Sequence, residues 1–182
     1  MSTPSSTPSL ADRVRATLRP IPDYPKPGII FQDITPVLAD GSLLQEVIGA
    51  LAAPFATAGV THVLGIEARG FILGGAVASR LGVGFVPARK PGKLPWERVS
   101  EAYELEYGAD ALECHRDGLS RRSRVLVVDD VLATGGTAAA AGRLAQGLGA
   151  ALAGWTFLLE IGPLEGRKRL GGTAPSVSLV TV

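Results

Sequence analysis

Apolar positions follow two different spacings along this chain, and the two spacings alternate. Short runs of apolar, often β-branched residues predict strands at 62–66, 84–89, 125–128 and 155–161 and an edge strand at 176–182. Apolar residues that recur every three or four positions predict helices at 10–18, 42–58, 71–81 and 138–147, with Ser42 as the N-cap of the second. Strands that alternate with helices in this way predict an α/β fold with a parallel sheet wound by helices on both faces.

The strand predicted at 125–128 leads into a polar segment that we expect to carry the site. Asp129 and Asp130 follow the strand, and then come a loop at 133–137 and an alanine-rich helix. This order predicts a site at the carboxyl end of a parallel strand, where the first N–H groups of the new helix point into the site. The loop glycines let the backbone approach an anion closely, and the threonine hydroxyls add donors. An ordinary α/β turn would explain everything except the acidic pair.

The loop at 133–137 differs from the commoner phosphate loops. It lacks the lysine of a Walker A loop and the Gly-x-Gly-x-x-Gly fingerprint of dinucleotide-binding proteins. Two carboxylates would repel a phosphate alone. They suit a ligand that also carries hydroxyl groups, or a Mg²⁺ ion between carboxylate and phosphate. A ribose phosphate with a free diol has those groups.

Two further strands end in charged side chains. Arg69 follows the strand at 62–66 and begins a helix, which is a suitable place to bind an anion, although a surface charge or a pair with Glu67 would explain it as well. The strand at 84–89 ends in Arg89, Lys90 and Lys93, a positive cluster that is followed by the acid-rich stretch 101–113. Separate blocks of opposite charge indicate either a function or mutual pairing.

Two segments lie outside the regular alternation. Residues 96–115 are predicted to form a long β-hairpin, extended at 100–107 and 111–115 with a turn at 108–110, and long excursions of this kind are often lids. Near the N-terminus, four prolines between 20 and 27 end the first helix and hold an extended arm. An irregular apolar segment, 28–36, follows this arm and is expected to form either a lid over the core or a wall of a ligand pocket.

Composition and charge exclude several classes of protein. The 182 residues suit one domain with a small appendage, and a net charge of +1 argues against nucleic-acid binding. No apolar run approaches the ~20 residues of a membrane span, and the Ser/Thr/Pro-rich N-terminus is typical of a disordered tail, not of a secretory signal. The single cysteine, Cys114, excludes an internal disulfide, and with only His62 and His115 beside it a zinc site is disfavoured. We expect a soluble, cytoplasmic protein.

Five segments resemble one known family. The central run Val-Val-Asp-Asp-Val-Leu-Ala-Thr-Gly-Gly-Thr resembles the phosphoribosyl pyrophosphate (PRPP) motif of the type I phosphoribosyltransferases. Four other segments resemble the adenine phosphoribosyltransferases and occur in that family's order, at 28–36, 67–71, 89–95 and 103–108. The central motif alone implies PRPP binding, and the other four segments favour adenine as the base.

The resemblance implies a fold and a domain arrangement. The fold is the type I phosphoribosyltransferase fold, α/β, with a doubly wound, mostly parallel sheet, a small N-terminal hood and a flexible β-hairpin lid. Residues 1–9 are then the disordered tail, 10–36 the N-terminal helix and the hood over the base site, and 37–182 the core, with the lid at about 91–113. A homodimer is expected from the family.

The resemblance also implies a reaction, in which adenine and PRPP give AMP and pyrophosphate in purine salvage. The cofactor would be Mg²⁺, held mainly by substrate and water without a direct protein ligand. Glu106 on the lid is the candidate acid/base, while Asp129 and Asp130 would contact the ribose and lie near the cation that develops at its C1. The residues expected to bind PRPP or AMP are Ala133, Thr134, Gly135, Gly136, Thr137, Arg69, Gly70, Arg89, Lys93 and Tyr107. The residues expected to bind adenine are Ile30, Phe31, Gln32 and Ile161.

One departure and two alternatives accompany the resemblance. Gln32 stands where many members of the family carry arginine. A phosphoribosyltransferase for another base, such as a 6-oxopurine, is the first alternative. The second is a non-catalytic PRPP-binding regulator that binds nucleic acid, which would need an added DNA-binding segment. Residues 1–20 hold one short predicted helix, too little for a helix-turn-helix.

Overall fold

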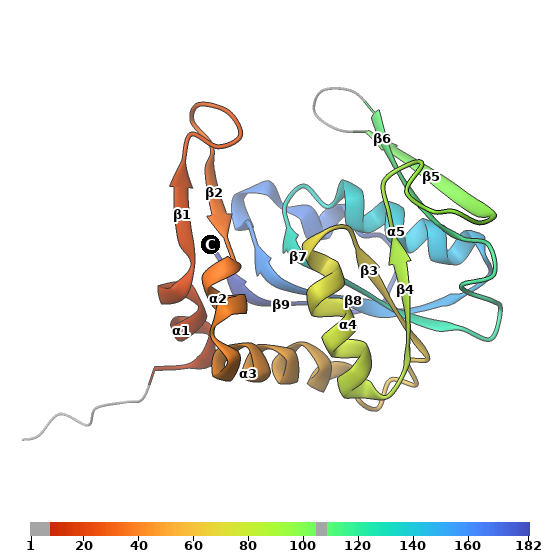
Figure 1. The fold of residues 1–182 in the computed structure, drawn as a ribbon, viewed down its shortest axis with the longest axis horizontal. Coiled ribbons are helices and arrows are strands. Elements are labelled where there is room, and N and C mark those ends of the chain that lie inside the picture. The colour runs from red at the N-terminus through yellow and green to blue at the C-terminus, as the bar shows by residue number, and fades with distance from the viewer. Residues whose placement is uncertain (1–7, 105–108) are drawn as a thin grey trace, which may run out of the picture. The chain divides into compact units, whose positions relative to one another are not determined.

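The computed structural model describes residues 8–104 and 109–182, and Figure 1 shows their arrangement into helices and strands. The chain forms two compact units, Met1–Val47 and Ile48–Val182, and each is described here by itself. No helix within the described ranges has the length and apolar character needed to cross a membrane.

The first unit begins with a helix and a small hairpin. In α1 (Leu10–Thr17) Ser9 is the N-cap, and its hydroxyl accepts a hydrogen bond from the Asp12 N–H. Strands β1 (Arg19–Pro22) and β2 (Ile30–Asp33) pair antiparallel. The prediction of an irregular segment at 28–36 is therefore wrong over β2. Both strands are edge strands of a two-stranded sheet, and edges are where the prolines of β1 are tolerated.

Two helices follow the hairpin, α2 (Thr35–Ala39) and α3 (Gly41–Ala52). The predicted N-cap Ser42 is wrong, because the Asp40 carboxylate accepts a hydrogen bond from the Leu43 N–H at 3.0 Å. Asp40 stands directly before the helix, where a short acidic side chain reaches the first free N–H groups. The predicted helix at 42–58 ends early, since α3 stops at Ala52 and passes into a 3₁₀ turn, η1 (Ala53–Phe55), which contains Pro54.

The second unit is built on a five-stranded parallel sheet, as the sequence predicts. Its strands are β3 (His62–Ile66), β4 (Gly84–Ala88), β7 (Arg124–Leu132), β8 (Ala151–Glu160) and β9 (Ser176–Thr181). Their order in the sheet is β4-β3-β7-β8-β9, and every pairing is parallel. The chain leaves β3 toward one edge and β7 toward the other, so the space between their carboxyl ends is the topological switch point of the sheet.

Different elements cover the two faces of this sheet. Helix α4 (Arg69–Leu81) packs closely on one face, where a Cβ atom added to Gly74 would lie 3.3 Å from the Cα of Gly65 in β3. Helix α5 (Gly136–Gly147) and the hairpin of β5 (Arg98–Glu104) and β6 (Ala109–His115) cover the other face. One core cluster on that face joins Leu112 of the hairpin, Leu144 of α5 and Val127 of β7.

Several strands begin or end at other residues than the sequence predicts. Strand β7 continues to Leu132, so the two aspartates belong to the strand and do not follow it. Ala109 and Asp110 pair with Glu104 and Tyr103, so the turn predicted at 108–110 is wrong for these two residues. Strand β8 starts at Ala151, four positions before the predicted start. The segment after it forms two 3₁₀ turns, η2 (Gly162–Leu164) and η3 (Gly166–Arg169).

Candidate functional site

The candidate site lies at the switch point, where two loops leave the carboxyl ends of neighbouring strands. Strand β3 ends at Ile66 and leads through Glu67 and Ala68 into α4. Strand β7 ends at Leu132 and leads through a short loop into α5. Two helices therefore begin beside one another at this edge of the sheet (Figure 1), and helix N-termini attract anions.

The loop after β7 encloses a cavity of about 80 Å³, lined by Asp129 and residues 131–138. Gly135 precedes α5 with a φ of +80°, a left-handed conformation that glycine adopts without strain. The first turn of α5 contains no acidic residue. Because the first N–H groups of a helix have no partner within it, this cavity is suited to a phosphate.

Gly166 of η3 supports this loop from behind, and the sequence analysis missed its role. A Cβ atom on Gly135 would overlap the Gly166 carbonyl group, and a Cβ atom on Gly166 would lie 3.0 Å from the Gly135 nitrogen. Only glycines allow the two backbones to come this close. The two residues are far apart in the chain, so neither spacing nor periodicity indicates the contact.

The two aspartates of β7 have different surroundings. Successive side chains of a strand point to opposite faces. Asp129 is half-buried and lines the loop cavity, and its Oδ1 accepts a hydrogen bond from the Asp130 N–H at 2.9 Å. Asp130 is buried, and its Oδ2 lies 2.5 Å from the Arg69 Nε. Arg69 thus pairs with Asp130, a partner that the sequence analysis did not consider.

Burial raises the pKa of the Asp129 carboxyl well above its usual range, and the neighbouring Asp130 charge raises it further. The hydrogen bond from the Asp130 N–H and the charge of Arg69 oppose this shift without cancelling it. Asp129 therefore keeps its proton to a higher pH than an exposed aspartate.

Gly70 brings the start of α4 against β7. A Cβ atom added to it would lie 2.8 Å from Asp129 Oδ1 and 2.9 Å from the Val128 carbonyl oxygen. Any side chain there would push the helix N-terminus and Arg69 away from the aspartates. The structure thus shows that Gly70 permits a close approach of α4 to β7, while its predicted role in binding PRPP stays a prediction.

Glu67 orients the positive cluster that follows β4, a role that the sequence analysis did not assign. Its Oε2 accepts hydrogen bonds from the Arg89 Nε and from the Lys90 N–H, both at 3.0 Å. The Arg89 Nη1 donates to the Lys93 carbonyl at 3.1 Å, and the guanidinium lies 5.8 Å from the centre of the Phe71 ring. Arg89 is therefore held beside the start of α4.

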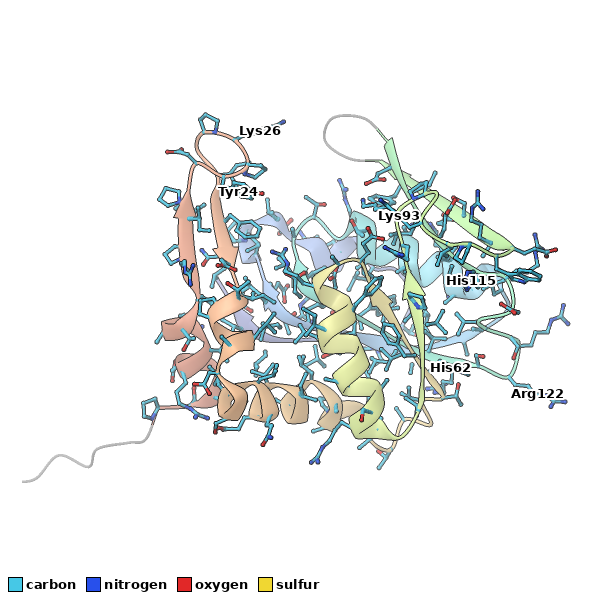
Figure 2. The ribbon with its side chains drawn as sticks, viewed as in Figure 1. Tyr24, Lys26, His62, Lys93, His115 and Arg122 are labelled. Carbon is cyan, nitrogen blue, oxygen red and sulfur yellow. The ribbon has the colours of Figure 1, made fainter. Side chains whose placement is uncertain are left out.

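The two lysines of the cluster differ. The Lys90 ammonium donates to the Tyr103 hydroxyl at 2.8 Å and pairs with Asp110, so it is directed to the β5–β6 hairpin. Burial alone would lower the Lys90 pKa, but the hydrogen bonds to Asp110 and Tyr103 outweigh burial and the net pKa is raised. Lys93 is exposed, and within the described part of the chain its side chain makes no ion pair (Figure 2).

The remaining predicted residues lie in three parts of the chain. Glu106 and Tyr107 lie outside the described residues. Ile30, Phe31 and Gln32 belong to β2 in the first unit, where Phe31 makes an edge-to-face contact with Tyr24 at 5.2 Å. Ile161 belongs to the second unit, and its N–H donates to the Leu132 carbonyl at 2.9 Å, which places it at the end of β7.

The donor set at the site bears on the expected Mg²⁺. Among the described residues there is no group of three or more His, Cys, Asp or Glu side chains that would form a protein-built metal site. Asp129 lines the cavity of the phosphate loop, and the neighbouring Asp130 is already paired with Arg69. Such a site fits an ion that takes most of its ligands from substrate phosphates and water.

Comparisons with known proteins identify similar chains. Residues 36–168 match the family model described as "Phosphoribosyl transferase domain". The adenine phosphoribosyltransferase of Myxococcus xanthus (strain DK1622) is 57% identical over 169 residues, which cover 90% of this chain and 92% of that protein. The structure of adenine phosphoribosyltransferase from Rhodothermus marinus DSM 4252 superimposes with a TM-score of 0.92 at 47% identity, covering 95% of this chain and 98% of that one. The Saccharomyces cerevisiae enzyme, crystallised with adenine and an imino-altritol bisphosphate, gives a TM-score of 0.87 at 40% identity and covers 93% and 98%.

Proposed function

This chain belongs to the adenine phosphoribosyltransferases, within the wider phosphoribosyl transferase family, and from that premise we propose which residues perform the reaction. The enzyme transfers the 5-phosphoribosyl group of PRPP to N9 of adenine and releases AMP and pyrophosphate, a reaction of purine salvage. The observation that carries the residue assignments is the phosphate loop after β7, with two aspartates and Arg69 beside it.

The 5-phosphate of PRPP binds in the loop cavity. The N–H groups at the start of α5 point toward a group in that cavity, and the hydroxyls of Thr134 and Thr137 supply further donors. Ala133, Gly135 and Gly136 contribute backbone only. Gly166 keeps the loop in this shape from behind.

The ribose lies over the end of β7. As the bond from C1 to pyrophosphate breaks, positive charge develops on the ring, and carboxylates nearby stabilise it. Asp129 is the more accessible of the two, while Asp130 is buried against Arg69. Asp129 therefore contacts the ribose hydroxyls, and Asp130 acts partly by holding Arg69.

The pyrophosphate binds where α4 begins. Arg69 stands on the first turn of α4 and Gly70 brings that turn against β7. Arg89, oriented by Glu67, adds a second guanidinium, and the exposed Lys93 adds a third cation. Negative charge grows on the leaving group, so these cations stabilise the transition state more than the ground state.

Adenine recognition and proton transfer rest on the family resemblance. Ile30, Phe31 and Gln32 of β2, with Ile161 after β8, form the base site in this proposal, and Glu106 exchanges the proton of the imidazole ring while Tyr107 covers PRPP. Gln32 replaces an arginine that is common in the family. We also propose the family's homodimer, and a cytoplasmic location stays a prediction.

When bound, Mg²⁺ would supply neutralisation of the phosphate charges. Asp129 and Asp130 are the residues that would hold it, through water, because the described part of the chain offers no larger cluster of ligands.

The test of the function is a base-specificity assay. The chain is incubated with PRPP, Mg²⁺ and one of adenine, hypoxanthine, guanine or xanthine, and the nucleotide formed is measured. We expect AMP formation to exceed the other rates by at least about a hundredfold, because a site that hydrogen-bonds one base edge leaves buried groups unpaired with another. Preference for a 6-oxopurine would overturn the base assignment. PRPP binding without turnover of any base would favour the regulator.

The role of Glu106 has its own test. Glu106→Gln should leave PRPP affinity nearly unchanged and lower kcat about 10²- to 10⁴-fold, since the side chain keeps its size but cannot accept the proton. Glu97→Gln is the matched control, because Glu97 is an exposed glutamate near the start of the same hairpin. Turnover like that of the unmodified enzyme would remove Glu106 from the mechanism.

A further inference from the structure

A second cavity, of about 480 Å³, lies in the second unit between α5, the start of β8 and the segment after η3. Its lining shares no residue with the cavity of the phosphate loop. Gly142, Leu152 and Trp155 contribute to an apolar floor, and Arg143, Arg169 and Thr173 contribute polar groups. A volume of this size and a mostly apolar lining with a few polar groups are typical of small-molecule sites.

The floor contains a buried donor that has no partner. Trp155 is 1% exposed, and its Nε1–H forms no hydrogen bond with any described residue. A Cβ atom on Gly142 would lie 3.2 Å from the Trp155 Cζ2 and 3.6 Å from its Nε1, so the indole edge that carries the donor lies directly beneath Gly142. Gly142 itself lines the cavity. The Nε1 atom is itself covered, so Trp155 lies behind the cavity wall and senses changes in the packing of that wall.

The charge of the lining indicates an anion. Among the described residues the lining contains two arginines and no aspartate or glutamate. Arg143 also pairs with Glu101 of β5 at 2.6 Å, so its charge is partly neutralised. Arg169 makes no ion pair with a described residue, and its side chain is exposed at the cavity. A guanidinium binds phosphate oxygens in a two-pronged geometry that few other groups match.

We propose that this cavity is a second ligand site, which binds a nucleoside monophosphate with its phosphate at Arg169 and Arg143 and its base against the apolar wall that includes Gly142 and Leu152. The apolar floor accepts a flat ring, and the arginines accept a dianion. The site depends on neither Asp129 nor the phosphate loop. It does share two elements with that loop, because α5 begins in the loop and η3 contains Gly166.

The native fluorescence of Trp155 tests this proposal on the full chain. The chain has two tryptophans, and Trp96 is 64% exposed, so Trp96→Phe leaves Trp155 as the sole reporter. GMP, UMP and inorganic phosphate are titrated separately, because AMP is expected at the catalytic site. We expect each nucleotide to cause a saturable change in the Trp155 fluorescence, with a Kd below about 1 mM. Inorganic phosphate should cause a smaller change.

Three variants in the Trp96→Phe background decide the location. Arg169→Gln should weaken the nucleotide response about tenfold. Arg122→Gln is the matched control, since this exposed arginine extends outward from the loop before β7 (Figure 2) and should change nothing. Thr137→Ala alters the phosphate loop and should leave the response intact.

Each of the other outcomes overturns the proposal. Absence of any saturable change removes the site. A response that Thr137→Ala abolishes and Arg169→Gln preserves would come from the phosphate loop. A Trp155 signal that follows protein concentration instead of nucleotide, together with a doubled mass in solution, would assign the cavity to a second copy of the chain.

Discussion

Asp129 stands at the end of a buried strand, beside a second carboxylate and beside the cavity that we assign to a phosphate. Burial and the neighbouring Asp130 charge disfavour a negative charge on Asp129 and outweigh the Asp130 N–H and the Arg69 charge, so the pKa of Asp129 is raised. The position is unfavourable for folding and suited to catalysis, because a carboxylate there faces the ring on which positive charge develops. Such a conflict between stability and activity is common at functional sites.

Asp129→Asn should make the protein more stable near neutral pH and much less active. A carboxyl whose pKa is raised by folding adds to the free energy of unfolding at pH values below its pKa in the unfolded chain, about 3.9. This contribution is lost as the pH rises through the pKa in the folded protein. The unmodified protein therefore loses stability with rising pH over this window, and the asparagine variant does not. Urea unfolding near pH 7 should show a gain of about 0.5–2 kcal/mol.

Asp117→Asn is the control, because Asp117 is exposed. It should leave the free energy of unfolding within about 0.5 kcal/mol. A loss of stability in Asp129→Asn at neutral pH would mean that Asp129 is charged and well paired in the fold.

Gly135→Ala should damage the phosphate loop, while Gly147→Ala should not. An alanine at 135 must adopt a φ of +80° and its Cβ would meet the Gly166 backbone. We expect a loss of about 1–3 kcal/mol and a raised KM for PRPP. Nothing lies within 4 Å of a Cβ at Gly147 in α5, so alanine there should stabilise by about 0.5–1 kcal/mol. Thermal unfolding and initial rates are measured for both variants. If Gly135→Ala changes neither, the contact between Gly135 and Gly166 does not shape the loop.

Residue types in the sequence indicated the charges of the site but not their partners. Arg69 could be proposed as an anion-binding residue from its place at the start of a helix, and the structure pairs it with Asp130 of β7. Glu67 and Gly166 act through contacts with residues that are distant in the chain. No local pattern encodes such contacts, because they depend on how neighbouring strands end.

Among the elements, η3 is held to the edge of the sheet by an ion pair between the exposed Arg167 and the buried Glu160. The Arg167 Nε donates to both Glu160 carboxylate oxygens at 2.8 Å, and its Nη2 donates to the Ser178 hydroxyl at 3.0 Å. The hydrogen bonds from Arg167 lower the Glu160 pKa, although burial opposes them. This pair fixes the turn that carries Gly166 and thereby supports the phosphate loop.

Arg167→Met should lower the free energy of unfolding by about 1–3 kcal/mol near neutral pH, since Glu160 would stay buried without its donor. A lowered pKa contributes stability above the unfolded value of about 4.3 and loses it as pH falls through the folded value. The difference between variant and unmodified protein should therefore shrink in acid, as measured by urea unfolding at neutral pH and at about pH 3.

Lys168→Met provides the matched control. Lys168 pairs with Glu165 at 2.7 Å, but both side chains are mostly exposed, so its loss should cost at most about 1 kcal/mol. Equal effects of the two substitutions would contradict a special role for the Arg167–Glu160 pair.

Apolar runs predicted the strand cores well and their ends less well. The buried stretch of β7 is plain from its four apolar residues, yet the ladder continues through two aspartates, because backbone pairing with β8 does not depend on side-chain polarity. The hairpin of β1 and β2 escaped prediction since prolines disfavour strands, except at the edges that both strands occupy. The N-cap of α3 is Asp40 and not Ser42. Aspartate and serine cap helices about equally well, so the sequence does not rank them.

At the scale of the whole molecule, the alternation of strands and helices was sufficient to predict a parallel sheet and a site at the strand ends. The order of the strands, which creates the switch point between β3 and β7, was not in the pattern. It depends on which strand each helix packs back upon. The family resemblance supplied the base, the lid and the dimer, and the structure tests none of these three.

Cys114 offers a probe of the folding of the second unit as a whole. It is the only cysteine, it lies buried in β6, and burial raises the pKa of its thiol to about 12. Because only an exposed thiolate reacts with an aromatic disulfide, the native protein should remain unlabelled at neutral pH. Labelling should appear in urea as the unit unfolds.

Ligands that bind only the folded state should slow this labelling. With PRPP and Mg²⁺ at about 100 times the Kd, the folded state gains about 2.7 kcal/mol, and labelling in a fixed, moderate urea concentration should slow about a hundredfold if opening equilibrates before the thiol reacts. Thr137→Ala should weaken the protection by raising the Kd. Rapid labelling of the native protein would show that β6 opens locally, and protection unaffected by Thr137→Ala would place PRPP away from the loop after β7.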